Sequence, residues 1–272
     1  MRPALFEGST FYCGIVPVLL VALAMASRSR AAQPTDHHVA QPERPTVATH
    51  AHTVAPGWVE IEAGIERDEH EDRSIGLASP LETKIGLTPH AQLSLNTPWQ
   101  RRESGPPSGA GPGDISVGVK WRLLDDAPLL GDFALLPTLK LPSGSAARGT
   151  GTGTTDGSLT VISSHEVGRV ALDLNAGFTR HSRSTHSTAR DATLWTVSTG
   201  TTLTESVAWA LELFGLPGTS GSAGERPIAA LLAGPTFTPR RWLELDAGLI
   251  VPISGPQPHA LYAGFVWNIG RL

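Results

Sequence analysis

The stretch from Asp114 to Leu123, DISVGVKWRL, alternates apolar and polar residues without a break. The odd-numbered positions are apolar: Ile115, Val117, Val119, Trp121 and Leu123. The even-numbered positions are polar or glycine: Asp114, Ser116, Gly118, Lys120 and Arg122. Successive side chains of a strand point to opposite faces, so a period of two predicts a β-strand with one apolar and one polar face.

The same alternation recurs along the chain after Pro56, and no convincing helix interrupts it. The further segments are 58–68, 81–87, 91–99, 133–141, 158–167, 170–180, 192–203, 207–214, 227–237, 242–250 and 259–269. Short connections such as 168–169 alternate with longer polar ones such as 142–157. This layout is typical of an outer-membrane barrel, with short turns on one side and long loops on the other. The sequence therefore predicts an all-β fold, an antiparallel transmembrane β-barrel of about twelve strands.

Aromatic residues fall mainly near the predicted strand ends, as expected for girdles at two membrane interfaces. One expected girdle contains Trp58, Trp121, Phe133, Trp209, Phe237, Trp242 and Trp267, and the other contains Trp99, Phe178, Trp195, Phe214 and Tyr262.

Composition excludes other classes. The chain has 272 residues and a net charge of −4, so it lacks the excess of basic residues that nucleic-acid binding needs. Gly, Pro and charged residues break every later apolar run before it reaches the length of a membrane helix. The single cysteine, Cys13, excludes a disulfide framework.

The first residues resemble a secretory signal rather than a buried helix. Arg2 precedes an apolar run over 13–25, and a small-x-small site ends at Ala26, with cleavage as late as Ala32 also compatible. Residues 1–26 are therefore predicted to be a signal peptide and 57–272 the barrel, in the outer membrane of a Gram-negative bacterium.

Between these parts, residues 33–56 are rich in His, Pro and Thr and are predicted to be a disordered lead-in. His37, His38, His50 and His52 could bind a metal, but their spacing matches no closed zinc site, and a solvated tail is the favoured interpretation. We expect no metal and no cofactor.

In a barrel, the polar face of each strand looks into the lumen. The candidate lumen-lining residues are Glu60, Glu62, Lys84, Asp114, Lys120, Arg122, Lys140, Asp173, Glu212, Glu244 and Asp246. Barrels of about 8 strands are filled by side chains, whereas those of 16–18 hold an aqueous channel. At about twelve strands, a narrow passage and a salt-bridged interior that only stabilises the wall are both compatible with the sequence.

Four segments carry a family resemblance: GPGDISVGVKWRLL (111–124), LLPTLKLPSGS (135–145), LDLNAGF (172–178) and AGFVWNI (263–269). In this order they resemble the MetA-pathway of phenol degradation family of outer-membrane proteins. The resemblance implies a barrel that acts as a channel or transporter for small aromatic or other hydrophobic compounds.

Two other functions are weighed against transport. Ser163 and His165 share a strand face, which allows a lipid hydrolase on the barrel wall, although nothing in the spacing specifies a catalytic group. Long loops such as 144–157 would instead suit a structural or adhesive surface protein. We predict that the protein is not an enzyme. The expected partners are outer-membrane lipid, lipopolysaccharide, the outer-membrane assembly machinery and an unidentified small-molecule substrate, but no nucleic acid.

Overall fold

The computed structural model describes residues 37–70, 73–102, 109–183, 190–217 and 227–272. Its elements are β1 (Trp58–Glu69), β2 (Ile75–Ser79), β3 (Leu81–Thr88), β4 (Ala91–Asn96), β5 (Trp99–Arg102), β6 (Gly109–Pro112), β7 (Ile115–Ala127), β8 (Gly131–Leu141), the 3-10 helix η1 (Ala146–Arg148), β9 (Asp156–Val167), β10 (Val170–His181), β11 (Asp191–Thr202), β12 (Val207–Leu216), β13 (Ile228–Arg240), β14 (Leu243–Ser254) and β15 (His259–Arg271). Within the described ranges, no helix has the length and apolar character needed to cross a membrane.

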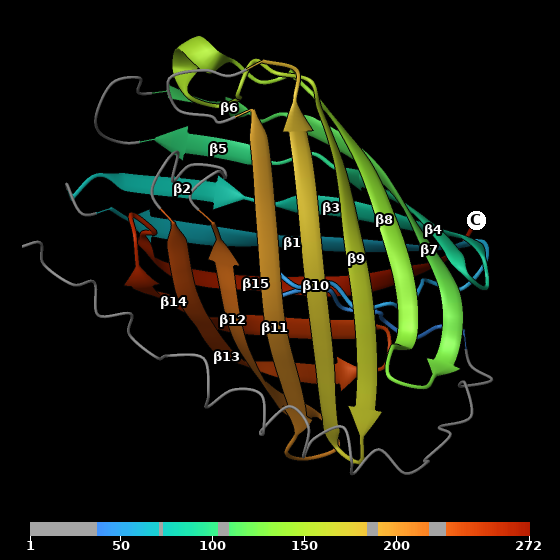
Figure 1. The fold of residues 1–272 in the computed structure, drawn as a ribbon. Helices are drawn as coiled ribbons and strands as arrows, with labels where there is room; N and C mark the ends of the chain where they lie inside the picture. The colour runs from blue at the N-terminus through green and yellow to red at the C-terminus, as the bar shows by residue number, and fades with distance from the viewer. Residues whose placement is uncertain (1–36, 71–72, 103–108, 184–189, 218–226) are drawn as a thin grey trace, which may run out of the picture.

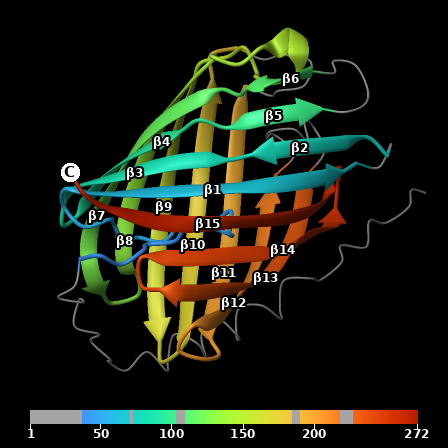
Figure 2. The same cartoon turned by 180° about the vertical axis from the view of Figure 1, so that it is seen from behind.

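The strands form one antiparallel sheet that closes on itself, because β15 pairs with β1 from Trp58↔Arg271 to Glu69↔His259. Three pairs of segments, β2 with β3, β4 with β5 and β6 with β7, each continue one another as a single broken strand. In the described chain the result is a closed barrel of twelve strands, as predicted, and Figures 1 and 2 show it from two opposite sides.

The three breaks have local causes. Pro80 separates β2 from β3 and Pro98 lies between β4 and β5; proline has no N–H to donate to a strand ladder. Gly113 lies at the third break and donates its backbone N–H to the Pro98 carbonyl at 2.7 Å. The three broken strands are neighbours in the sheet, and the hydrogen bond from Gly113 to Pro98 joins the breaks of two of them.

The two ends of the barrel differ as predicted. At what we call the turn end, consecutive strands are joined by short connections such as Gly168-Arg169, where Gly168 has φ 66°, a left-handed conformation that favours glycine. At the opposite loop end lie the longer connections, including 142–155 with η1. In outer-membrane barrels the short turns face the periplasm and the long loops face outward.

The outer wall is apolar. Its exposed side chains include the aromatic residues Trp99, Trp121, Phe178, Trp195, Trp209, Phe237 and Trp267. Four expected girdle residues are placed otherwise. Phe214 and Tyr262 are buried and share the inward-facing parity of Glu212 and Asn268 on their strands, and Trp58 and Trp242 lie on either side of the His38 ring. They depart from the prediction because position near a strand end does not determine the face.

The predicted disordered lead-in is wrong for the residues that the structure describes. Residues 37–56, here called the inner segment, have no helix or strand, yet they lie inside the barrel next to the first half of β1 (Figure 2). Disorder was predicted because the segment is rich in His, Pro and Thr and lacks periodicity. In the structure Ala48, Ala51 and Val54 are buried, and hydrogen bonds to the wall, described next, hold the segment in place.

Candidate functional site: a segment inside the barrel

Wall carboxylates accept hydrogen bonds from the backbone of the inner segment. Glu60 accepts from the Gln41 N–H at 2.7 Å. Glu212, on a strand across the barrel, accepts from the N–H groups of Val47 and Ala48 at 2.7 and 2.8 Å. A segment without secondary structure has no internal partners for its N–H groups, so these carboxylates take the role that a neighbouring strand would have.

Uncharged polar groups extend the same pattern around the wall. Asn175 accepts from the Thr49 N–H at 2.8 Å and donates to the Thr49 carbonyl at 2.9 Å. Ser164 accepts from the Ala51 N–H and Gln92 from the Val54 N–H, at 2.8 and 2.9 Å. The segment is thus bonded to strands on every side of the barrel.

Two fully buried lysines hold the segment by charge. Lys84 lies 2.7 Å from Glu60 and 2.5 Å from Glu62, and it also donates to the Gln41 carbonyl. Lys120 forms an ion pair with Glu43 of the segment.

Lys120 makes further contacts with the segment, donating to the His50 and His52 carbonyls at 2.8 and 3.0 Å. Burial opposes the charged form of Glu43, but the ammonium groups of Lys120 and Lys84 outweigh burial and hold the Glu43 pKa well below its usual range. The pair therefore stays ionised at neutral pH.

Arg44 forms the second ionic contact between the segment and the wall. Its Nε and Nη2 donate to the two carboxylate oxygens of Asp246 at 3.1 and 3.0 Å. The guanidinium lies against Gly64 and Gly264, which are paired across β1 and β15; a Cβ at either position would come within 2.6 Å of a guanidinium nitrogen. The wall therefore provides room for this side chain as well as its counter-charge.

The segment enters near the turn end. His38 lies between the rings of Trp58 and Trp242, with centroid separations of 5.0 and 5.8 Å. Asn268 donates to the Val39 carbonyl at 3.0 Å. Pro56 leaves at the same end, where it bridges Gly86 at the end of β3. The segment thus turns within the half of the barrel nearest the short turns.

The structure divides the candidate residues into groups. Glu60, Glu62, Lys84, Lys120, Arg122, Glu212 and Asp246 contact the inner segment directly. Asp173 does so through Ser164, whose hydroxyl donates to it at 2.5 Å. Glu244 accepts from Thr238 of the neighbouring strand. Lys140 and Asp114 pair at 3.2 Å at the loop end, away from the segment.

Several residues of the site were missed from sequence. Gln41, Glu43 and Arg44 belong to a stretch interpreted as disordered, and Gln92, Ser164 and Asn268 are uncharged. A signal was available: Gln92 and Ser164 have the same strand parity as the inward-facing charges, and Glu43-Arg44 is the one adjacent pair of opposite charges in 33–56.

An apolar cluster lies on the inward-facing side of β12 to β15. Its buried members are Phe214, Ala230, Leu232, Ile250, Ala260 and Tyr262. The cluster is on the loop side of Glu212 and Asp246, since Phe214 and Ile250 follow these carboxylates towards the loop end. The hydroxyl of Tyr262 is buried there and has no hydrogen-bond partner among the described residues. The predicted polar lumen is therefore incomplete, because one sector of the interior is apolar.

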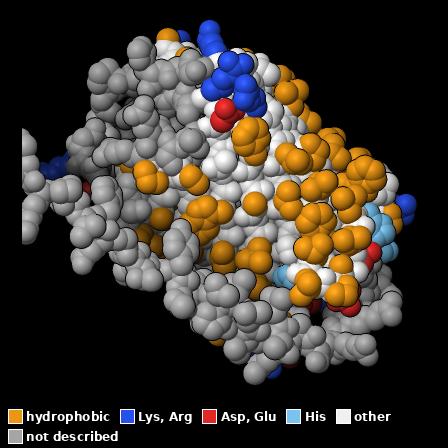
Figure 3. Space-filling view, viewed as in Figure 1, with side chains coloured by type: hydrophobic (Ala, Val, Ile, Leu, Met, Phe, Trp, Pro, Cys, Tyr) orange, Lys and Arg blue, Asp and Glu red, His pale blue; other side chains and the backbone are white. Residues whose placement is uncertain are grey.

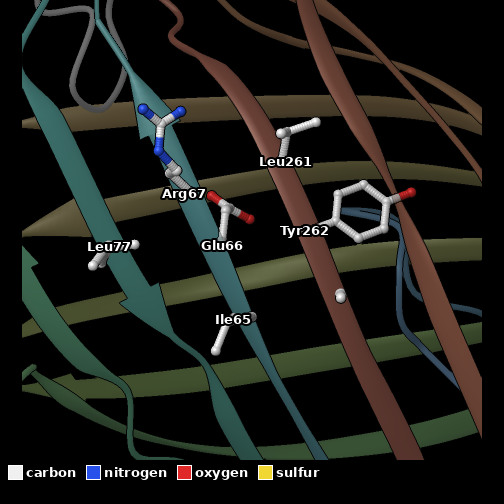
Figure 4. A pocket seen from close by; sticks show the side chains of 7 residues that line it. Ile65, Glu66, Arg67, Leu77, Leu261 and Tyr262 are labelled. Atoms are coloured by element: carbon white, nitrogen blue, oxygen red, sulfur yellow. The ribbon is translucent and has the colours of Figure 1, made fainter.

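A pocket of about 210 Å³ is present on the lipid-facing side where β15, β1 and β2 meet (Figure 4). Ile65, Leu77 and Leu261 line it with apolar surface. The pairing of β1 with β15 continues through this region, with Glu66 opposite Tyr262. The pocket is therefore a hollow in the outer surface and not an opening through these two strands.

The residues considered for catalysis lie close together but are poorly arranged for it. Ser163 Oγ is 2.9 Å from His165 Nε2 and donates its own proton to the Leu130 carbonyl at 2.7 Å. Since a hydroxyl has one proton, this arrangement makes His165 the donor and not the base that nucleophilic catalysis requires.

The structure also shows the surroundings of two histidines considered for metal binding, His50 and His52. His50 lies 5.3 Å from His52 between ring centroids, and His52 Nδ1 lies 3.5 Å from Asp132. Burial and the nearby Lys120 lower the His50 pKa well below its ordinary value. Among the described residues, no group of three or more His, Cys, Asp or Glu side chains is positioned to hold a metal ion.

The structure is thus a closed barrel whose inner segment is hydrogen-bonded to the inside of the wall, and sequence comparison places it in a family. A sequence model of the MetA-pathway of phenol degradation family matches residues 43–249. The chain belongs to this family. The match begins at Glu43, so it includes the part of the inner segment that carries Glu43 and Arg44. No curated protein matches this family member in sequence.

Solved structures share the fold. The COG4313 outer membrane channel from Pseudomonas putida F1 superimposes with a TM-score of 0.64 at 14% identity, covering 82% of this chain and 99% of that one. The NanC porin superimposes with a TM-score of 0.54 at 8% identity, covering 78% and 100%. At these identities the likeness shows the fold alone: this family member has the fold of outer-membrane barrel channels.

Proposed function

We propose that the protein is a passive outer-membrane channel for small hydrophobic or aromatic compounds, and that residues 1–26 direct its export as a cleaved signal. The observation that carries the substrate class is the apolar cluster around Phe214, Leu232, Ile250 and Tyr262 on the inward-facing wall. A barrel that served only polar solutes would gain nothing from this sector, whereas a hydrophobic solute would be favoured there by about 25 cal/mol for each Å² of apolar surface removed from water.

The inner segment supports a restricted path. It is bonded to opposite sides of the barrel in the half nearest the turn end, through Glu60 on β1, Asn175 on β10 and Glu212 on β12. A solute that enters from the loop end therefore meets the apolar cluster before the segment. This order suits a narrow, selective passage in which the segment sets the limiting dimension.

Liposome swelling tests the proposal. Purified protein in liposomes is exposed to matched osmolytes: a neutral aromatic alcohol, an aromatic acid, and a sugar of similar mass. We expect faster entry of the aromatic solutes than of the sugar, and a Phe214→Ser/Ile250→Ser variant that loses this preference while still migrating as a folded barrel in unheated detergent gels. Equal rates for all solutes in the unchanged protein would contradict the proposed substrate class.

A further inference from the structure

The loop end of the barrel carries an uneven charge. In the sequence around β9 to β11, residues 142–157 and 178–191 contain four cations, Arg148, Arg180, Arg183 and Arg190, and two anions, Asp156 and Asp191. The four arginines are exposed. Asp156 is buried and already pairs with Lys140 and His181. This part of the rim therefore presents an excess of arginine, here called the arginine patch.

Contacts hold two sides of the patch together. Arg183, just beyond β10, donates to the Gly153 carbonyl of loop 142–155 at 3.0 Å. A Cβ on Gly153 would contact both Arg183 and Ala146 of η1, the helix that contains Arg148. Arg180 pairs with Asp191 at 2.7 Å on the exposed face of β10 and β11. Arg148 and Arg183 have no acidic partner among the described residues' ion pairs.

The surface directly below the patch is apolar. Phe178 lies two residues before Arg180 on the same exposed face of β10, and it is opposite Leu159 on β9. Gly157 is opposite Arg180, and apart from its chain neighbours no described residue has an atom within 4 Å of the position its Cβ would occupy. Figure 3 shows Lys and Arg side chains gathered at this end of the wall above a surface of hydrophobic side chains. A molecule seated here would meet guanidinium groups above and apolar side chains below, with free space beside Arg180.

We propose that the arginine patch binds the phosphorylated head group of lipid A, with an acyl chain of the same molecule against Leu159 and Phe178. Guanidinium groups match phosphate oxygens with two parallel hydrogen bonds, which explains arginine rather than lysine at all four positions. The acyl contact distinguishes a lipid from a free phosphate, since Leu159 and Phe178 offer nothing to an inorganic ion. Loops at this end face the leaflet that contains such glycolipid in outer membranes.

The test measures lipid binding by folded protein in detergent micelles, with native mass spectrometry as the readout. The three probes are bisphosphorylated lipid A, the same lipid without its phosphates, and inorganic phosphate. We expect lipid A to bind, the dephosphorylated lipid to bind at least tenfold more weakly, and millimolar inorganic phosphate to leave lipid A bound. Equal binding of the two lipids, or full competition by inorganic phosphate, would overturn the proposal.

Variants locate the site. Each arginine near an anionic lipid surface contributes enough for about a fivefold change in affinity, so Arg180→Gln/Arg183→Gln should weaken binding roughly 25-fold. The matched control, Arg169→Gln/Arg240→Gln, removes two exposed arginines at the turn end and should leave affinity unchanged.

Asp191→Asn supplies the opposite prediction. It releases Arg180 from its ion pair and should tighten binding of lipid A severalfold. Loss of affinity in the turn-end control, or no loss in the patch variant, would place the lipid elsewhere. Heat-modifiable migration in detergent gels verifies that each variant is folded, so an unchanged affinity in a folded patch variant refutes the proposal directly.

Discussion

Arg44 and Asp246, which are 202 residues apart in the sequence, meet inside the barrel in a two-bond contact of 3.1 and 3.0 Å. The Asp246 side chain is almost completely buried. Removing one partner of a buried pair leaves the other charge uncompensated, at a cost of about 3–5 kcal/mol. Arg44→Gln should therefore loosen the inner segment and raise single-channel conductance in planar bilayers. The matched variant Arg44→Gln/Asp246→Asn leaves no unpaired buried charge. Its conductance should therefore lie between that of wild type and that of Arg44→Gln. A conductance equal to wild type in Arg44→Gln would contradict the role of this contact.

A substitution at Gly264 tests whether the Arg44 guanidinium needs the space beside this glycine. A Cβ at this position would lie 2.5 Å from Arg44 Nε and 2.6 Å from the Ala63 carbonyl oxygen, so Gly264→Ala should displace the segment. Limited proteolysis of the protein in liposomes should then cleave the segment at least several times faster than in wild type. Gly157→Ala is the control, because in the described part of the chain only its two neighbours in sequence lie within 4 Å of its Cβ position. Identical cleavage of both variants would show that the guanidinium does not need this space.

Lys120→Met should weaken the binding of the inner segment to the barrel wall more than Lys140→Met does. Lys120 contacts Glu43 and two backbone carbonyls of the segment, whereas Lys140 pairs with Asp114 and Asp156 at the loop end. Loss of the buried lysine leaves Glu43 unpaired, again at a cost of about 3–5 kcal/mol. Conductance should rise in Lys120→Met and stay near wild type in Lys140→Met. The opposite order would place the limiting element at the loop end.

The contribution of Glu43 should depend on pH with a defined sign. Its pKa is held below the usual range when the segment is docked, so its stabilisation is fully present above the ordinary glutamate pKa of about 4.3 and is lost as the pH falls through the lowered docked value. The difference in conductance between wild type and Glu43→Gln should therefore be constant from pH 8 to about pH 5 and shrink only in stronger acid. A difference that disappears between pH 7 and pH 6 would show that another group governs docking.

Sequence alone was sufficient for the barrel but not for its contents. Alternation such as that of 114–123 predicts both the strand and its inward face, because the pleat allows only two sides. The number of strands follows from the same pattern, but the breaks do not: the predicted segment 91–99 continues through Pro98, and β2 and β6 lie outside every predicted segment.

The inner segment could not be predicted in this way. Its order depends on partners that are distant in sequence, and residues such as Gln41 and Val47 take part through backbone N–H groups, which every residue but proline possesses. The apolar sector was missed for a related reason. Phe214 and Leu232 satisfy the same period of two as lipid-facing residues, and only the register with Glu212 and Asp246 places them inside.

The contacts of the inner segment also have a consequence for the timing of folding. The segment precedes every strand, yet its partners extend from Glu60 on β1 to Asn268 on β15, 229 residues beyond Val39. Contacts of such long sequence separation form late, because the intervening chain must first be ordered. The inner segment, which precedes β1 in the sequence, is therefore expected to dock among the last parts of the described chain, after β15 has closed the barrel on β1.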